Sequence, residues 1–180
     1  MTLFTIGHST RTLAEFVALL QAHGIRNLID VRRYPGSRRY PHFAREALAA
    51  ALPPLGIAYA HEPELGGRRT PRPDSPNGAW RSASFRAYAD HMEEPAWQAA
   101  LARVLEQAAR DRTAVMCAEA VPWRCHRQLI ADAVVARGGA VRHVLGANRA
   151  ELHTLNEHAR VDAAGHVRYP ADSTAQGELL

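Results

Sequence analysis

Two patterns of hydrophobic residues alternate along the first 145 positions of the chain. Short apolar runs rich in β-branched residues have the length of buried β-strands. Five such runs are present, at Leu3–Ile6, Asn27–Val31, Ile57–Ala60, Thr113–Cys117 and Ala140–Leu145. Between them, apolar residues recur at the spacing of a helix with one buried face. These helical segments are the stretch from Leu13 to the stop at Gly24, Ala44–Leu52, Phe85–Met92, Ala96–Arg110 and a segment from about Cys125 to Arg137.

This alternation predicts the fold class. Thr12 followed by Glu15 is a capping box that starts the first helix. Strands that alternate with helices favour crossover connections and a parallel sheet that is covered on both faces. We therefore expect a single three-layer α/β domain over residues 1–160, with a mostly parallel sheet of about five strands flanked by helices. Residues 161–180 are expected to form a partly disordered C-terminal tail, and Glu151–Arg160 a further helix.

Composition indicates the class of protein and its expected location in the cell. The chain has 180 residues, of which 47% are hydrophobic and 22% charged, as in one globular domain. The longest apolar stretch, Ala47–Ala60, is too short to cross a bilayer and contains two prolines, so no membrane partner is expected. The N-terminus lacks the pattern of a signal peptide, and two cysteines provide no disulfide framework. These features predict a cytoplasmic protein.

All of the basic residues are arginines. The sequence contains 22 of them and no lysine, against 18 acidic residues. Codon bias accounts for this usage, but the chemistry remains, because a guanidinium group stays protonated and binds phosphate or carboxylate as a fork. In parallel sheets ligands bind beyond the carboxyl ends of the strands. The candidate chemistry is therefore sought in the segments that follow the strands, including the long loop Glu62–Ser82, which is either functional or mobile.

The segment Cys117–Arg127 (CAEAVPWRCHR) follows a buried strand and leads into a helix. The free amides and the dipole of a helix start favour an anion, and Arg124 and Arg127 add to this preference. The same field lowers the pKa of a nearby thiol, so Cys117 or Cys125 is a candidate nucleophile or redox centre. Anion binding without thiol chemistry remains open, as does a filler role for two ordinary buried cysteines. The spacing and the adjacent His126 do not fit a zinc shell, so no metal is predicted.

Two further segments carry candidate residues. The run from Asp30 to Arg45 (DVRRYPGSRRYPHFAR) combines arginines with aromatic side chains, a pattern that suits phosphate clamping and base stacking. It reads equally as a solvated loop, with Asp30 and Arg32 forming a buried structural pair. In the turn after the first strand, His8 could act as a general acid or base, or serve only as a hydrogen-bonded structural residue.

Four separated motifs resemble the domain-of-unknown-function 488 family: TIGHST at Thr5–Thr10, LIDVRRYPGSR at Leu28–Arg38, LGG at Leu65–Gly67 and CAE…CHR at Cys117–Arg127. The resemblance covers roughly residues 3–145 and implies an α/β fold, but no activity. Its motif residues here are His8, Ser9, Asp30, Arg32, Pro35, Ser37, Cys117, Glu119, Cys125, His126 and Arg127. A weaker likeness to rhodaneses and cysteine phosphatases rests on LIDVR and a strand-end cysteine. It lacks their short loop closed by arginine, because six residues separate Cys117 from Arg124.

The leading hypothesis is an enzyme that acts on a phosphate-bearing or other anionic substrate, such as a nucleotide or nucleic acid, at the carboxyl edge of the sheet. Its candidate catalytic residues are His8, Asp30, Glu119, Cys117 and Cys125, and its candidate binding residues are Ser9, Arg32, Ser37, His126 and Arg127. No cofactor is predicted. The alternatives are a nucleic-acid or nucleotide binding protein without turnover, and a redox-responsive interaction protein in which the two cysteines change state.

Overall fold

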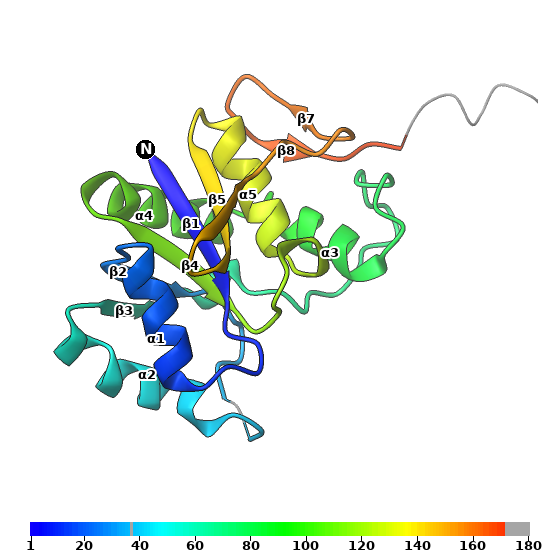
Figure 1. Ribbon diagram of the computed structural model, residues 1–180. Coiled ribbons are helices and arrows are strands. Elements are labelled where there is room, and N and C mark those ends of the chain that lie inside the picture. The colour runs from blue at the N-terminus through cyan, green and yellow to red at the C-terminus, as the bar shows by residue number, and fades with distance from the viewer. Residues whose placement is uncertain (37, 172–180) are drawn as a thin grey trace, which may run out of the picture.

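The computed structural model describes residues 1–36 and 38–171 (Figure 1). Its centre is a six-stranded sheet in the order β3-β2-β4-β1-β5-β6. The first five strands in this order are parallel, and only β6 runs antiparallel, against β5. The strands are β1 (Thr2–Gly7), β2 (Asn27–Asp30), β3 (Ala58–His61), β4 (Thr113–Cys117), β5 (Ala140–Gly146) and β6 (Arg149–Leu152). The expected mostly parallel sheet is confirmed, with β6 as an additional edge strand.

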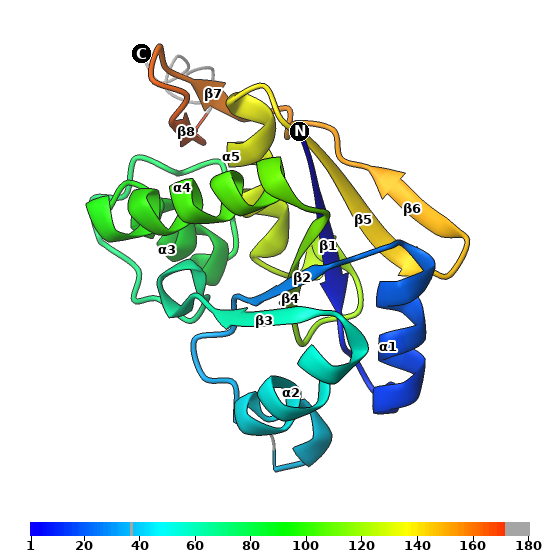
Figure 2. The ribbon, with the colours of Figure 1, turned by 90° about the vertical axis from the view of Figure 1, so that its left-hand side faces the viewer.

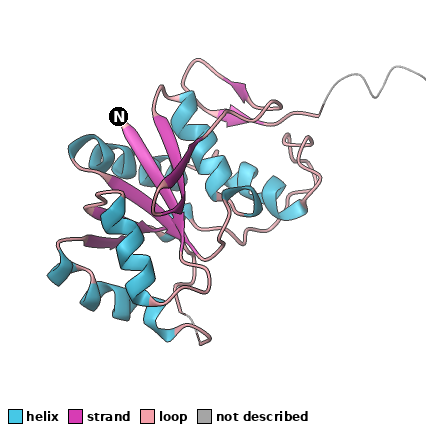
Figure 3. Cartoon of the chain, in the orientation of Figure 1, coloured by secondary structure: helices cyan, strands magenta, loops and turns pink. Residues whose placement is uncertain are grey.

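Helices cover both faces of this sheet (Figures 2 and 3). One hydrophobic cluster joins a sheet face to α1 (Leu13–Ala22) and α2 (Arg45–Ala51). The other joins the opposite face to α3 (Ala83–His91), α4 (Pro95–Arg110) and α5 (Arg127–Ala136). Four short 3₁₀ helices each begin with a proline, whose fixed φ suits a first helical position. They are Pro41–Phe43, Pro53–Leu55, Pro63–Leu65 and Pro122–Arg124. The three-layer α/β domain expected from the sequence is therefore present.

Local sequence signals account for where the first elements begin and end. The capping box at α1 forms as predicted, with Thr12 Oγ1 accepting from the Glu15 amide and the Glu15 carboxylate accepting from the Thr12 amide. Gly24 follows the helix with a φ of 62°, a left-handed conformation that glycine adopts without strain. At Gly7 the reason for glycine is space, because a Cβ there would lie 1.7 Å from the Glu119 carbonyl oxygen.

The region after β5 differs from the prediction. The helix expected over Glu151–Arg160 is wrong, because the chain turns back and pairs as β6 with the otherwise open edge of β5. A second small sheet, β7 (Arg160–Val161) and β8 (Val167–Arg168), then precedes the fully buried Tyr169. Residues 161–171 of the expected tail thus pack on the domain, and residues 172–180 lie outside the described part. No helix among the described residues is long and apolar enough to span a bilayer.

The strand register brings three loops together at the carboxyl edge of the sheet. Gly7 at the end of β1 lies opposite Cys117 at the end of β4, and Asp30 at the end of β2 lies opposite Met116. Backbone hydrogen bonds continue this pairing into the loops, from His8 N to the Cys117 carbonyl at 3.0 Å and from Val31 N to the Met116 carbonyl at 2.9 Å. The loops that carry the candidate residues therefore start from neighbouring positions.

Candidate active site at the carboxyl edge of the sheet

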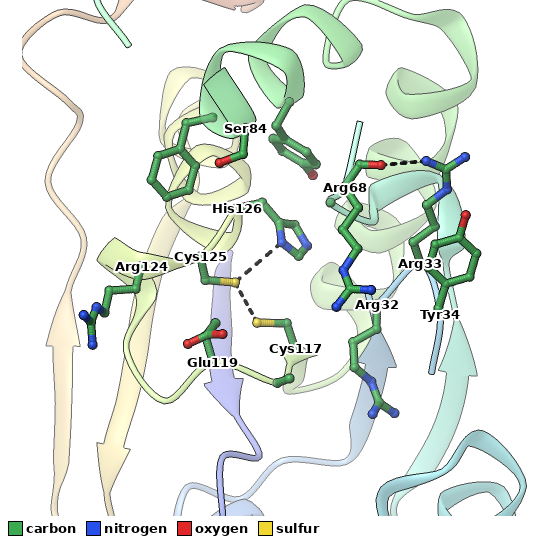
Figure 4. A pocket seen from close by; sticks show the side chains of 14 residues that line it. Arg32, Arg33, Tyr34, Arg68, Ser84, Cys117, Glu119, Arg124, Cys125 and His126 are labelled. Atoms are coloured by element: carbon green, nitrogen blue, oxygen red, sulfur yellow. Dashed lines mark hydrogen bonds between the residues drawn. The ribbon is translucent and has the colours of Figure 1, made fainter. Parts of the chain in front are cut away.

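A cavity of about 300 Å³ opens between these loops and α3 (Figure 4). Its floor is the end of β4 and the start of α5, and its walls are the long loop after β3, the loop after β2 and α3. The lining residues are Arg32, Arg33, Tyr34, Gly67, Arg68, Ser84, Phe85, Tyr88, Cys117, Ala118, Glu119, Arg124, Cys125 and His126. Apolar rings and cationic groups thus share one pocket, a composition typical of small-molecule sites.

Both cysteines of the chain lie at the floor of the pocket. Cys117 ends β4 and Cys125 comes shortly before α5, and each is 3% exposed. Both are free thiols, and their sulfur atoms are 2.6 Å apart. Figure 4 shows them side by side beneath His126. A covalent change at one sulfur therefore takes place within reach of the other.

Arg127 lies directly behind the two thiols. It is 1% exposed and is held by three hydrogen bonds from its guanidinium group. The Nε atom donates to Cys117 Sγ at 3.2 Å, one terminal nitrogen donates to the Glu119 carbonyl at 2.5 Å, and the other donates to Thr5 Oγ1 at 3.4 Å. A buried positive charge that touches a thiol favours the ionised form of the pair.

The surroundings divide the two thiols into one acid and one thiolate. Burial alone raises the pKa of Cys125, but the hydrogen bond from Cys117 and the charge and backbone amide of Arg127 outweigh it and lower that pKa to about 6. Burial and the hydrogen bond to Cys125 instead raise the pKa of Cys117 well above its usual value. At neutral pH, Cys125 is thus the thiolate and Cys117 is the neutral hydrogen-bond donor.

His126 contacts the thiolate from the other side. Its Nε2 lies 3.3 Å from the Val31 carbonyl oxygen, which can only accept, and its Nδ1 lies 3.5 Å from Cys125 Sγ. The Val31 carbonyl assigns the ring proton to Nε2 and leaves Nδ1 as an acceptor, which takes a hydrogen bond from Cys125 only while that group is a thiol. Burial lowers the pKa of His126, so the ring stays neutral at pH 7. The ring packs on Tyr88 at a centroid distance of 5.0 Å.

Three arginines and one carboxylate surround the entrance of the pocket. Figure 4 shows Arg33 and Arg68 on one side of the cysteine pair and Arg124 on the other. Arg33 donates to the Arg68 carbonyl at 2.7 Å, whereas no described residue forms a hydrogen bond or an ion pair with the side chains of Arg68 and Arg124. The Glu119 side chain is exposed at the same entrance. These guanidinium groups are available to an anionic ligand.

Asp30 and Arg32 form a closed ion pair next to the pocket. Asp30 is fully buried and accepts from Arg32 Nε at 2.8 Å, from an Arg32 terminal nitrogen at 2.6 Å and from Tyr59 Oη at 2.7 Å. The same terminal nitrogen also donates to the Phe43 carbonyl at 2.7 Å. The structural reading of this pair, one of the two alternatives from the sequence, matches the geometry. Arg32 lines the cavity, but its guanidinium group is already occupied.

His8 and Ser9 lie away from the cavity. The His8 ring stacks on Phe43 at 4.3 Å, and its Nδ1 and Nε2 are engaged by the Ser9 carbonyl and by Arg32. Burial lowers the pKa of His8 to about 4, so the ring is neutral at pH 7. Ser9 adopts a φ of 52°, and its amide donates to the Ala118 carbonyl. The two residues thus brace the loop after β4 rather than face a ligand.

The predicted site residues therefore differ in their position relative to the cavity. Cys117, Glu119, Cys125, His126 and Arg32 line the cavity, and Arg127 supports it from behind. Asp30, His8 and Ser9 do not line it. Ser37 lies outside the described residues. The part of the chain that the structure describes holds no cluster of three or more His, Cys, Asp or Glu side chains that could bind a metal ion.

Sequence reasoning did not single out several pocket residues. Arg68 comes from the long loop after β3, whose length had indicated either function or mobility. Ser84, Phe85 and Tyr88 come from α3, which the pattern identified only as a helix with a buried face. The signal for Arg68 was its position directly after the LGG motif at the ligand-binding edge. The α3 residues gave no signal, because a helix face that lines a pocket resembles one that lines a core.

Fold and site together define a three-layer α/β domain with a cysteine pair beneath an arginine-lined pocket. The family described as "Domain of unknown function DUF488" matches residues 12–134, well over half of the chain, and the protein belongs to this family. The resemblance stated from the motifs is thereby confirmed, although the TIGHST motif precedes the matched range. No curated protein and no solved structure matches the chain.

Proposed function

We propose that the protein is a cysteine-dependent enzyme that acts on a phosphate-bearing or otherwise anionic substrate, with Cys125 as the nucleophile. The observation that carries the proposal is the position of the Cys125 thiolate, at the floor of a pocket whose entrance bears guanidinium groups. A thiolate, unlike a thiol, is a strong nucleophile at neutral pH. The arrangement combines this nucleophile with a means of holding a negatively charged molecule over it.

The arginines would bind the charged part of the substrate. Arg68 and Arg124 can each form paired hydrogen bonds to a phosphate or carboxylate, and Arg33 retains donors beyond its bond to the Arg68 carbonyl. The rings of Phe85 and Tyr88 supply an apolar wall for the rest of the molecule. A nucleotide, which combines a planar ring with phosphate, has this chemistry.

In the first step, the lone pair of Cys125 Sγ forms a bond to an electrophilic atom of the bound substrate. The bond from that atom to its leaving group breaks, and the leaving group departs with the electron pair. The leaving group takes up a proton from water at the open entrance of the pocket, where the exposed Glu119 carboxylate can orient that water. The hydrogen bond from Cys117 and the nearby charge of Arg127 stabilise the thiolate until the substrate binds.

Water would complete the reaction. Its oxygen forms a bond to the electrophilic atom that Cys125 Sγ carries, the bond from that atom to the sulfur breaks, and the electron pair returns to Cys125 as the thiolate. The proton that water loses passes to the solvent, and no atom changes its oxidation state. Cys117, whose sulfur is 2.6 Å from Cys125 Sγ, donates a hydrogen bond to the thiolate that leaves.

A pair of alkylating reagents that differ in charge tests the proposal without knowledge of the substrate. Iodoacetate is anionic and iodoacetamide is neutral, and both alkylate thiolates. We expect the wild-type protein to favour iodoacetate several-fold more than the urea-unfolded chain does, with modification at Cys125 by mass spectrometry. The variant Arg68→Ala/Arg124→Ala should lose that preference, and Arg149→Ala, on the distant β6, should retain it. Equal preference in the folded and unfolded protein would contradict anion binding at the thiol.

A nucleic-acid binder without turnover is the second candidate, and two exposed rings favour it. Tyr34 is 62% exposed and directly follows Arg33, and Trp123 is 56% exposed and directly precedes Arg124. Bases stack on exposed aromatic rings while arginines hold the phosphates. Affinity for single-stranded DNA should then fall steeply as salt increases, and Trp123→Ala should weaken it. A log–log slope near zero would exclude this candidate.

A further inference from the structure

A line of buried polar side chains leads away from the cysteine pair, and the proposed reaction does not use it. It starts at Arg127, whose guanidinium donates to Thr5 Oγ1 at 3.4 Å. Thr5 Oγ1 lies 2.7 Å from His143 Nδ1, and His143 Nε2 lies 2.9 Å from His153 Nδ1. His153 Nε2 lies 2.8 Å from Asp132 Oδ1. The line joins β1, β5 and the segment after β6 to α5, and β1, β5 and β6 lie side by side in Figure 2.

With both imidazoles neutral, the Asp132 end sets the direction of the hydrogen bonds along the line. The guanidinium of Arg127 can only donate, so the Thr5 oxygen accepts from it and keeps its own hydrogen available for His143 Nδ1. The Asp132 carboxylate can only accept, so His153 Nε2 carries the hydrogen. A neutral imidazole has one N–H, and each ring therefore accepts at Nδ1 and donates at Nε2. All donors thus point from the active site towards Asp132.

Burial makes this direction costly to change. Thr5 is fully buried, Asp132 is 1% exposed and His143 is 6% exposed. Burial, His153 and Arg127 together lower the pKa of His143 to about 3, so this ring stays neutral in the physiological range. Two further donors hold the carboxylate of Asp132, the Tyr169 hydroxyl at 2.7 Å and the Asn156 amide at 2.9 Å. A buried donor left without an acceptor in such a line is destabilising, because it has lost its water and gained no partner.

We propose that Thr5, His143, His153 and Asp132 form a positioning relay that fixes the guanidinium group of Arg127 against the Cys117–Cys125 pair. The proposal rests on the proposed function, because it assigns these residues to the support of the Cys125 thiolate. Arg127 has one anchor on each terminal nitrogen, and Thr5 is the one that comes from a side chain. Without it, one terminal nitrogen loses its side-chain acceptor, and the position of the charge relative to the two sulfurs is less tightly fixed.

Thr5→Val tests the relay with little change of shape, because valine replaces the hydroxyl by a methyl group. Thr5→Ser is the matched control, since it keeps the hydroxyl. The measurement is the rate of iodoacetamide alkylation as a function of pH. It reports on this site alone, because the two cysteines of the chain are Cys117 and Cys125. We expect Thr5→Val to shift the midpoint upwards and to slow alkylation at pH 7 by roughly fivefold. Thr5→Ser should follow the wild-type profile.

The far end of the relay offers a second, independent test. In Asp132→Asn the side-chain amide can either accept a hydrogen bond from His153 or donate one to it, so the direction of the hydrogen bonds along the line is no longer fixed. We expect the midpoint of the alkylation profile to shift to higher pH. Tyr169→Phe is its control, because it removes a hydrogen bond to the same carboxylate but leaves the relay intact. Tyr169→Phe should lower the thermal unfolding temperature without a shift of the alkylation midpoint.

The outcomes separate the relay from the proposed function. A wild-type midpoint near the ordinary thiol pKa of about 8.5 would remove the thiolate at Cys125, and the proposed function with it. A low wild-type midpoint that Thr5→Val and Asp132→Asn leave unchanged would overturn the relay alone. A shift of equal size in Tyr169→Phe would also overturn it, because general destabilisation would then explain the effect.

Discussion

Two buried arginines at the same edge of the sheet differ in the kind of side chain that they contact. Arg32 meets a carboxylate, Asp30, and the pair is closed by Tyr59 and the Phe43 carbonyl, so its charge is used within the fold. Arg127 meets two thiols, which are weaker acceptors, and these thiols face a cavity. The difference between the two arginines is that the partner of Arg127 borders a cavity, whereas the carboxylate that pairs with Arg32 is enclosed by the fold. A carboxylate satisfies the guanidinium, whereas a thiolate is stabilised by it and stays reactive.

The largest effect is expected from opening the closed pair. Asp30→Ala leaves the guanidinium of Arg32 buried without its counter-charge, and the free energy of unfolding should fall by about 3–5 kcal/mol. Glu119→Ala, which removes an exposed carboxylate at the same edge, should change it by less than about 0.5 kcal/mol. Urea unfolding followed by circular dichroism measures both. Similar losses in the two variants would show that the Asp30–Arg32 pair is not the structural one.

The open pair should show its largest effect in reactivity. Cys125→Ser leaves only Cys117, whose burial raises the pKa of its thiol, so alkylation at pH 7 should slow by roughly a hundredfold. Cys117→Ser keeps the reactive thiol together with a hydroxyl donor beside it, and the rate should stay within about tenfold of wild type. Stopped-flow alkylation with both variants checks the assignment. Fast reaction in Cys125→Ser would assign the nucleophile to Cys117 instead.

The pH profile sharpens the same comparison. Because the pKa of Cys125 is lowered to about 6, its thiolate fraction rises as pH increases through 6 and is nearly complete at pH 7.5. The alkylation rate should therefore level off near neutrality, whereas the urea-unfolded chain should keep accelerating through a midpoint near 8.5. Identical profiles before and after unfolding would show that the fold does not activate the thiol.

The smallest effect is expected from a single exposed arginine. Arg124→Ala should reduce the preference for iodoacetate over iodoacetamide by about two- to threefold, because solvent screens an exposed charge. The difference from wild type should shrink as salt increases from 20 mM to 500 mM, a range over which the screening length falls below about 5 Å. A preference that does not respond to salt would indicate a packing effect at the pocket entrance.

Much of this architecture follows from local patterns in the sequence. Buried strands such as Thr113–Cys117 are short apolar runs, and the rule that ligands bind at the carboxyl edge placed the cysteine loop correctly. The pattern failed after β5, where polar residues that suit a helix form an edge strand and a small hairpin. Edge pairing depends on an unpaired neighbour in three dimensions, which a sequence window does not contain.

The sequence also could not predict which of the candidate residues line the cavity and which are enclosed by the fold. Asp30, His8 and Cys117 all follow strands at one edge, and spacing alone cannot show which of them turns towards the cavity. The outcome depends on competing partners: Arg32 reaches Asp30 within its own loop, whereas Arg127 reaches Cys117 from the next helix. The sequence left both readings of Asp30 open, and only the hydrogen-bond geometry favours one of them.

The close approach of Gly7 to the Glu119 carbonyl has a mechanical consequence. That carbonyl is also an acceptor for Arg127, so the backbone of β1 and the guanidinium group clamp the same peptide group from two sides. A single methyl group at position 7 would clash with this carbonyl and push the loop after β4 away from β1. The first strand therefore fixes the position of the loop between the two cysteines, and the missing side chain of Gly7 is what allows strand and loop to pack this closely.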